Sequence, residues 1–146
     1  MSDNNIVIEE LVTIEEWKKA FPVMNQLRTH LNETSYTELV KEASQKDGYR
    51  LFALFSEDQI VAVIGFIPMI TLYNGRFIWV CDLVTDESAR SKGYGELLLT
   101  HIEELAKKEG YECISLSSGL QRTNVHRFYE EKMDYDKVSY VFLKKF

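Results

Sequence analysis

The chain has 146 residues, of which 45% are hydrophobic and 27% are charged, and its formal net charge is −6. This length fits a single domain over residues 1–146, and the composition is that of an ordinary soluble globular protein. The negative net charge argues against non-specific binding to nucleic acid.

The N-terminal residues, MSDNNIVIEE, lack the basic and then apolar order of a signal peptide, and no apolar run is long enough to cross a bilayer. We therefore expect a cytoplasmic protein with no membrane partner. Cys81 and Cys113 both lie in apolar, strand-like runs without metal-ligand spacing. We expect them to be reduced, buried packing residues, and we expect no bound metal.

A short strand over residues 5–12 opens the chain, and a helix follows it. Thr13 and Glu16 form a capping box at the start of that helix, and apolar residues then recur at helical spacing as far as Leu31. Pro22 falls inside the pattern, so it should kink the helix or divide it in two.

A second helix follows in the predicted order. Ser35 and Glu38 have the spacing of a second capping box, and Leu39, Val40 and Ala43 supply an apolar face. Gly48 is the expected C-terminal cap of this helix.

Three strands over residues 49–55, 60–70 and 77–84 are expected to form an antiparallel meander. Asn74-Gly75 is a strong hairpin signal between the second and third of them. Pro68 indicates that the second strand is irregular, or paired on one side only, near its end. The third strand is apolar nearly throughout, which predicts a central position buried on both faces.

The remaining elements are a helix that starts near Gly93 and ends at Gly110, a strand over 113–116, a helix from Thr123 or Asn124 to Glu131, and a last strand over 138–146. The order β-α-α-β-β-β-α-β-α-β places antiparallel hairpins before a strand–helix–strand crossover. This order predicts a mixed α/β fold.

The most informative stretch is residues 80–99, which reads VCDLVTDESARSKGYGELLL. A strand leads through a polar turn to Arg90, Lys92, Gly93 and Gly95 at the mouth of a helix. Glycines allow the backbone to approach a bulky ligand, and the free amides of a first helical turn attract anions. The stretch therefore predicts a phosphate or pyrophosphate site. The alternative is a tight strand-to-helix turn with two solvated basic residues.

This R-x-x-G-x-G pattern resembles the coenzyme A pyrophosphate loop of the GNAT superfamily of N-acetyltransferases. The segments Ser117–Arg122 and Asn124–Tyr129 are similar to the last strand–helix unit of that family, so the resemblance runs from Trp79 to the end of the chain. The chain departs from the family pattern at Ala89, where an aromatic residue is frequent, and at Asp134, which stands in place of a glycine.

The resemblance implies a central, mostly antiparallel sheet with helices on both faces, splayed where the strand near Val84 ends. The pantetheine arm of acetyl-CoA would lie in that gap, bonded to the backbone of Leu83, Val84 and Thr85. The alternative for Leu83 and Val84 is core packing, and both interpretations can hold together. The implied contacts of the pyrophosphate are Arg90, Ser91, Lys92, Gly93, Tyr94 and Gly95.

A second implied cluster lies on the last helix. Asn124 would contact the pantetheine and the Tyr129 hydroxyl would stand near the sulfur, with Phe128 beside it. A phenol with a pKa of about 10 can donate a proton to the leaving thiolate. The alternative for Phe128 and Tyr129 is an aromatic pair that packs the helix onto the sheet.

The acceptor amine must lose a proton, and Asp82 on the central strand is the best carboxylate candidate for the base. The alternative is that Asp82 caps the backbone or pairs with a basic residue. From element position alone, the residues expected to frame the acceptor pocket are Trp79, Tyr36, Glu33 and Arg28.

The sequence thus predicts an N-acetyltransferase that moves an acetyl group from acetyl-CoA to a primary amine by direct attack in a ternary complex. The acceptor is a small molecule or a peptide, and the family resemblance also suggests a homodimer. Two alternatives are a non-catalytic acyl-CoA-binding regulatory module of the same fold and an unrelated phosphate-binding protein.

Overall fold

A computed structural model describes residues 5–119 and 122–146 of the chain. The chain divides into two compact units, Met1–Ser115 and Leu116–Phe146, and each is described by itself. In chain order the elements are β1 (Ile6–Leu11), α1 (Ile14–Leu27), α2 (Glu33–Asp47), β2 (Arg50–Ser56), β3 (Gln59–Thr71), β4 (Gly75–Thr85), the 3₁₀ turn η2 (Glu87–Ala89), α3 (Tyr94–Lys108), β5 (Cys113–Leu116), α4 (Thr123–Arg127) and the π-helical turn η3 (Phe128–Lys132).

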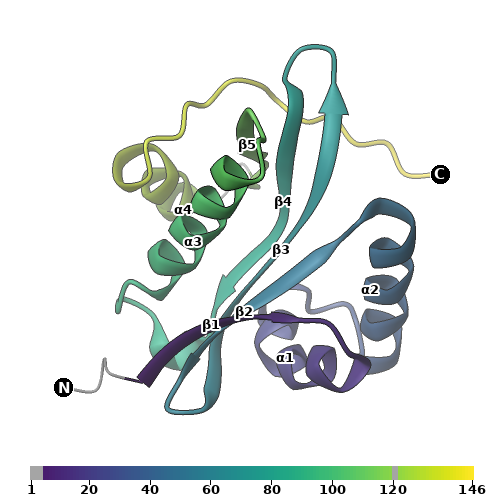
Figure 1. Ribbon diagram of the computed structural model, residues 1–146, viewed down its shortest axis with the longest axis vertical. Coiled ribbons are helices and arrows are strands. Elements are labelled where there is room, and N and C mark those ends of the chain that lie inside the picture. Colours follow the sequence, from purple (N-terminus) through teal and green to yellow (C-terminus); the bar gives the residue numbers. More distant parts are fainter. Residues whose placement is uncertain (1–4, 120–121) are drawn as a thin grey trace. The chain divides into compact units, whose positions relative to one another are not determined.

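The five strands form one sheet in the order β1-β2-β3-β4-β5 (Figure 1). The first three neighbouring pairs are antiparallel, so the predicted meander is confirmed. β2 begins opposite Phe66 of β3, so Pro68 is paired with β4 alone, as its position in the sequence predicted. Together with the four helices, this is the mixed α/β fold expected from the order of elements.

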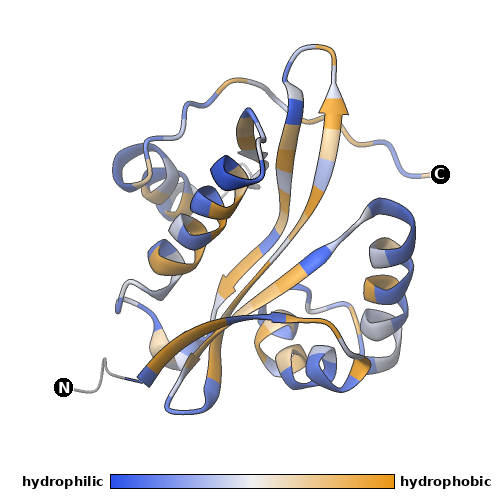
Figure 2. Ribbon diagram, in the orientation of Figure 1, coloured by the Kyte–Doolittle hydropathy of each residue, from blue (hydrophilic) through white to orange (hydrophobic). Residues whose placement is uncertain are grey.

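The sheet of the first unit is covered by α1 and α2 on one face and by α3 on the other (Figure 1). The strands are predominantly hydrophobic and the helices are banded (Figure 2), which is the pattern of a sheet buried between amphipathic helices. Leu51 and Ala53 of β2 join the core beneath α1 and α2. Phe52 alternates with them and meets His101 of α3, with 5.9 Å between the ring centroids.

β4 is buried on both faces only at its start. Phe77 and Ile78 are consecutive buried residues, whereas most of the later residues of the strand are half-buried. β4 has a neighbour on each side, as predicted, but the predicted burial on both faces holds only at its start. The longest buried runs lie in β2 and β3.

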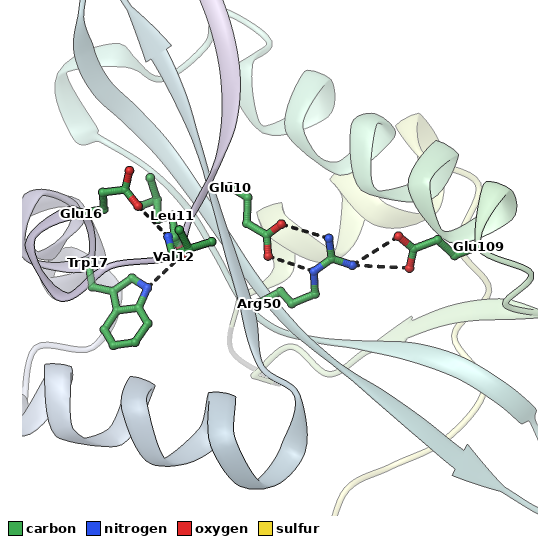
Figure 3. Close-up of polar contacts among 7 residues, drawn as sticks. All are labelled: Glu10, Leu11, Val12, Glu16, Trp17, Arg50 and Glu109. Atoms are coloured by element: carbon green, nitrogen blue, oxygen red, sulfur yellow. Dashed lines mark hydrogen bonds and ion pairs between the residues drawn. The ribbon is translucent and has the colours of Figure 1, made fainter.

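α1 begins as the sequence predicts. The Thr13 side chain accepts a hydrogen bond from the Glu16 N–H, and the Glu16 carboxylate accepts from the Thr13 N–H. The same carboxylate also accepts from the Val12 N–H (Figure 3). The helix continues through Pro22 to Leu27, so this proline does not divide it.

The predicted N-terminal cap of α2 is wrong, because the helix begins about one turn earlier. Asn32, rather than Ser35, caps the helix, and Ser35 occupies the third helical position and bonds back to the Asn32 N–H. Asn is as strong an N-cap as Ser, so the two overlapping patterns could not be ranked from the sequence. Gly48 ends the helix in the left-handed conformation, as expected.

The largest difference from the sequence prediction lies at the C-terminus. Residues 134–146 form neither helix nor strand, so the strand predicted over 138–146 is wrong. Its valines and aromatic residues have high strand propensity, but a strand requires a partner edge, which propensity cannot supply. Asp134 adopts the left-handed conformation with φ of 61°, which aspartate tolerates better than most residues do.

A three-way ionic cluster ties the sheet to the end of α3. Arg50 donates from Nε and Nη2 to the two Glu10 oxygens, both at 3.0 Å, and from Nη1 to Glu109 at 3.4 Å (Figure 3). Its guanidinium also lies 5.4 Å from the centroid of the Phe52 ring and 5.6 Å from that of Phe66. Glu10 pairing contributes most to raising the pKa of Arg50. This geometry fixes the guanidinium over the sheet.

We predict that Glu10→Gln lowers the free energy of unfolding by up to about 1 kcal/mol, because it removes the charge of a two-bond pair held in place by aromatic rings. Urea unfolding at low and high salt would measure the effect, which should shrink as salt rises. The matched control is Glu42→Gln, which breaks the exposed Glu42–Lys46 pair on α2 and should change stability by about 0.3 kcal/mol. Equal effects at both positions would contradict the account.

Candidate functional site

β4 changes its course in the middle of the strand. Gly65 of β3 is opposite Asp82, but the next residue, Phe66, is opposite Val80, so Cys81 is an extra residue without a partner in β3. Such a bulge bends its strand and redirects the neighbouring side chains. Here it separates the regular start of β4 from the segment that leads into the glycine loop.

Asp82 is held on both of its oxygens. The Arg28 Nε–H donates to Oδ1 at 2.8 Å, and the Tyr49 hydroxyl donates to Oδ2 at 2.7 Å. Arg28 also donates from Nη2 to the Cys81 carbonyl at 2.8 Å. Of the two roles that the sequence leaves open for Asp82, pairing with a basic residue is thus present in the structure.

Burial governs the acid–base state of the groups around Asp82. Burial, and then the Asp82 charge, raise the pKa of Tyr49 well above its usual value. The same two causes raise the pKa of the half-buried Cys81 thiol to about 12, so it stays protonated at neutral pH. Cys113 is exposed, which corrects the prediction that both cysteines are buried.

The residues expected to frame an acceptor pocket differ in their exposure to solvent. Tyr36 is 2% exposed and donates its hydroxyl hydrogen to the Trp17 carbonyl, so it belongs to the core. Arg28, at the C-terminal cap of α1, keeps 40% of its side chain exposed beside Asp82.

α1 also holds the turn that follows β4. Gln26 donates from Nε2 to Asp86 and accepts at Oε1 from the Glu87 N–H at 2.9 Å. Hydrogen bonds from Ser88 and Gln26 lower the pKa of Asp86. Ala89 is buried at the end of this turn. The approach to the loop is therefore fixed from one side by α1.

The loop itself uses left-handed backbone. Ser91 and Gly93 have φ of 69° and 80°, and Gly93 is the N-cap of α3 without any side-chain hydrogen bond to the helix. A Cβ at Gly93 would meet nothing within 4 Å. Because the first intrahelical bond runs from the Leu97 N–H to the Gly93 carbonyl, the amides of residues 94–96 have no partner inside the helix. The end of a fifteen-residue helix thus presents open donors with its positive pole.

The basic side chains at the loop are placed differently. Arg90 is exposed and donates from Nε to the Thr85 carbonyl at 3.3 Å, which folds it back on the end of β4. Lys92 is exposed. Tyr94 is half-buried, with its hydroxyl 3.5 Å from Ser56 Oγ. Gly95 faces Thr85, since a Cβ there would lie 3.5 Å from Thr85 Oγ1.

The end of β4 extends past its short neighbour. Glu112, directly before β5, donates to the Arg76 carbonyl near the start of β4, and β5 has only four residues. Among the described strands, β3 is the neighbour of β4 on one side and β5 is its neighbour on the other. Because β5 is short and starts beside the beginning of β4, it ends before it reaches Leu83, Val84 and Thr85. Val84 is also 8% exposed and belongs to the core, so its side chain packs as the alternative interpretation expected.

Asn124, Phe128 and Tyr129 lie in the second unit. Asn124 is exposed on α4, while Tyr129 is half-buried in the π-helical turn η3, closed by the Met133 N–H and the Phe128 carbonyl at 3.2 Å. The Tyr129 ring contacts Phe128 edge-on, with centroids 5.2 Å apart, and Tyr135 at 5.8 Å. Single π-turns inside helices are frequent at functional sites.

Burial raises the pKa of Tyr129, and nearby Arg122 partly opposes that shift. The phenol therefore stays protonated at neutral pH. His126 is engaged elsewhere, with Nε2 2.8 Å from the Gly119 carbonyl. Leu120 and Gln121, in the segment Ser117–Arg122 that resembles the GNAT family, lie outside the described residues.

Sequence reasoning missed Tyr49, Gly65 and Gln26, which support this region. Gly65 was the available signal, because a glycine inside a strand marks a bulge or a close approach. Within the described ranges, no group of three His, Cys, Asp or Glu side chains could hold a metal ion. No helix in these ranges has the length and apolar character needed to span a bilayer.

The model of the acetyltransferase (GNAT) family matches residues 11–135, which include the loop, the bulge and the π-turn. The chain belongs to the GNAT acetyltransferase family. Over 139 residues, 95% of this chain and 98% of the relative, it is 42% identical to an uncharacterized N-acetyltransferase, YhdJ, of Bacillus subtilis strain 168. The GNAT assignment made from the loop pattern is thus confirmed.

Solved structures share the fold. A GNAT family acetyltransferase of Staphylococcus aureus matches with a TM-score of 0.78 and 22% identity, over 97% of this chain and 99% of its own. The aminoglycoside N-acetyltransferase AAC(6')-Iy, solved in complex with CoA, matches with a TM-score of 0.83 and 11% identity, over 96% and 93%. At these identities the likeness concerns the fold alone.

Proposed function

We propose that this GNAT protein is an acetyl-CoA-dependent N-acetyltransferase whose pyrophosphate site is the loop of residues 90–95. The observation that carries the proposal is the uncapped start of α3 behind a left-handed, unobstructed Gly93. Three free amides at a helix N-terminus suit the oxygens of a pyrophosphate. The solved complex of AAC(6')-Iy with CoA supports coenzyme A as a ligand of this fold. Ser91, Lys92 and Tyr94 complete the proposed loop contacts, and Arg90 would have to leave the Thr85 carbonyl to reach a phosphate.

The pantetheine arm is proposed to lie along the end of β4. Leu83, Val84 and Thr85 extend past the four residues of β5, so their backbone groups on that side are the natural partners of an added extended chain. Asn124 and Phe128, both in the second unit, are proposed cofactor contacts on the basis of the family resemblance alone. Side-chain packing of Val84 in the core is compatible with this role, because the proposed contact uses only backbone.

Tyr129 is proposed as the general acid. The acceptor nitrogen attacks the thioester carbon and loses a proton to solvent, the carbon–sulfur bond breaks, and the departing thiolate takes the proton of the Tyr129 hydroxyl, which solvent later restores. A phenol whose pKa is raised by burial is protonated at neutral pH, so the hydroxyl holds the proton that this step needs. No covalent intermediate on the protein is required, in keeping with direct transfer in a ternary complex.

The acceptor is proposed at the level of its chemistry, as a primary amine on a small molecule or a peptide. Asp82 was the sequence candidate for the base that takes the proton of this amine. Both of its oxygens already accept hydrogen bonds, which favours a supporting role. A cytoplasmic location and a homodimer are the sequence predictions that complete the proposal.

The loop proposal predicts how two glycines with the same backbone strain will differ. Gly93 and Gly110 have φ of 80° and 86°, and an added Cβ would meet nothing within 4 Å at either position. Gly93→Ala and Gly110→Ala should therefore each lose about 1 kcal/mol of stability. In calorimetry, only Gly93→Ala should also weaken acetyl-CoA binding, by about tenfold, because only there does the methyl group face the pyrophosphate.

Two further measurements complete that experiment. Gly95→Ala carries no such strain and should also bind acetyl-CoA more weakly. NAD at the same concentration should raise the melting temperature of the wild-type protein far less than acetyl-CoA does. Equal affinity in the Gly93 and Gly110 variants, or an equal response to NAD, would place the ligand elsewhere.

The general-acid proposal predicts that Tyr129→Phe keeps acetyl-CoA affinity and lowers turnover by about 10²–10³. The ring contacts with Phe128 and Tyr135 remain, so the fold should be retained. Steady-state assays on a panel of amines would find an acceptor and then measure the rate constant. The matched control is Tyr140→Phe, the same change at an exposed tyrosine of the same unit, which should leave turnover unchanged. Wild-type turnover in the Tyr129 variant would remove this hydroxyl from the mechanism.

A further inference from the structure

The bulge of β4 is held by a cluster that we call the bulge clamp: Arg28 at the C-terminal cap of α1, Tyr49 directly before β2, Gly65 of β3 and Asp82 of β4 itself. We propose that Arg28 is a positioning residue, which fixes the backbone of β4 at Cys81 and Asp82 and thereby the course of the strand into the cofactor site. The inference rests on the proposed function, since it concerns binding of coenzyme A along Leu83–Thr85.

The first argument is the way in which Arg28 grips the strand. One guanidinium reaches two consecutive residues of the bulge, the Cys81 carbonyl through Nη2 and the Asp82 carboxylate through Nε, both at 2.8 Å. A planar fork of donors can hold two acceptors in a fixed relative position, whereas a single ammonium cannot. The Cys81 carbonyl belongs to the residue that has no partner in β3, so Arg28 bonds the strand where the register breaks.

The second argument is the fit of Tyr49 to a glycine. The Tyr49 hydroxyl lies against Gly65 of β3, the residue directly opposite Asp82. A Cβ on Gly65 would lie 1.8 Å from that hydroxyl. From there it donates to the second Asp82 oxygen at 2.7 Å. The Asp82 side chain is 14% exposed, with an oxygen committed to each partner. The carboxylate thus links Arg28 to Tyr49, and protonation would remove the charge that pairs with Arg28.

The third argument is the place of Arg28 in the chain. Arg28 is the C-cap of α1, and its own N–H bonds to the Met24 carbonyl, so the base of the side chain is fixed by the helix. Two residues earlier, Gln26 bonds both Asp86 and Glu87 at the far end of β4. The last turn of α1 therefore contacts β4 on both sides of Leu83–Thr85, and a change in either contact is transmitted to the backbone between them.

The test measures binding of free coenzyme A by calorimetry, which needs neither an acceptor nor turnover. Arg28→Ala should weaken binding by about tenfold, and Arg28→Lys should weaken it to the same degree, because one ammonium does not bridge the two acceptors. Asp82→Asn should weaken binding less than Arg28→Ala does, since the amide oxygen still accepts from Nε and Arg28 keeps its bond to the Cys81 carbonyl. The matched control is Arg50→Ala, which removes another arginine–carboxylate pair of the same sheet and should lower stability without changing affinity.

Amide hydrogen exchange provides a readout that does not depend on the ligand. Exchange at residues 81–83 should be faster in Arg28→Ala than in Arg50→Ala. The clamp would be contradicted if Arg28→Ala had wild-type affinity for coenzyme A and wild-type exchange at residues 81–83. It would also be contradicted if Asp82→Asn bound coenzyme A normally but had lost turnover and the pH dependence of its rate, because Asp82 would then act as a base. If the wild-type protein does not bind coenzyme A, the proposed function fails, and hydrogen exchange alone then decides whether Arg28 holds the bulge.

Discussion

The absence of a side chain at Gly65 is the constraint on which the candidate site depends. The Tyr49 hydroxyl lies against Gly65 where it reaches Asp82, and a Cβ on Gly65 would occupy the position of that hydroxyl. The half-buried carboxylate then finds two donors, which offset the loss of water around its charge. Cys81 can be accommodated as an extra residue because its carbonyl bonds to Arg28 instead of to a neighbouring strand. One glycine thus permits a bent strand in the middle of a close-packed sheet.

The bend connects the core to the loop. Before Cys81, β4 contributes buried residues such as Phe77 and Ile78; after it, the strand runs past the end of β5 toward Thr85. Gln26 fixes the turn that follows, and Gly93 then opens α3 with free amides. Residues 75–96 therefore form one continuous arrangement of packed strand, turn and helix start. This arrangement explains how the short polar loop before α3 can hold the backbone amides of the helix start in a fixed direction.

Local signals predicted much of the fold. The capping box of Thr13 and Glu16, the left-handed glycines at 48 and 110 and the Asn74-Gly75 hairpin each depend on a few adjacent residues, and all are present. The predictions failed where the structure depends on a residue far away in the sequence, or where two nearby residues have the same propensity for one role. Asn32 competes with Ser35 as a cap, and the residues after Val138 need a strand edge that their own sequence does not contain.

The site divides in the same way. The loop pattern indicated the glycines and the start of α3, because an anion site at a helix end is a local feature. The bulge at Cys81 could not be predicted, since it exists only in the register between β3 and β4. The pairing of Asp82 with Arg28 joins residues 54 positions apart, so the sequence left base and ion pair as equal alternatives. The π-turn at Tyr129 similarly depends on backbone hydrogen bonds that residue types do not reveal.

The central claim is that coenzyme A binds along the end of β4 and at the start of α3. The most direct measurement is a titration of ¹⁵N-labelled protein with acetyl-CoA, followed by the amide resonances of the assigned backbone. The account predicts that the largest shifts fall on residues 83–85 and 90–96, with the helix-start amides of Tyr94, Gly95 and Glu96 among them. Saturable shifts that spare both segments, or no shifts at millimolar acetyl-CoA, would contradict it.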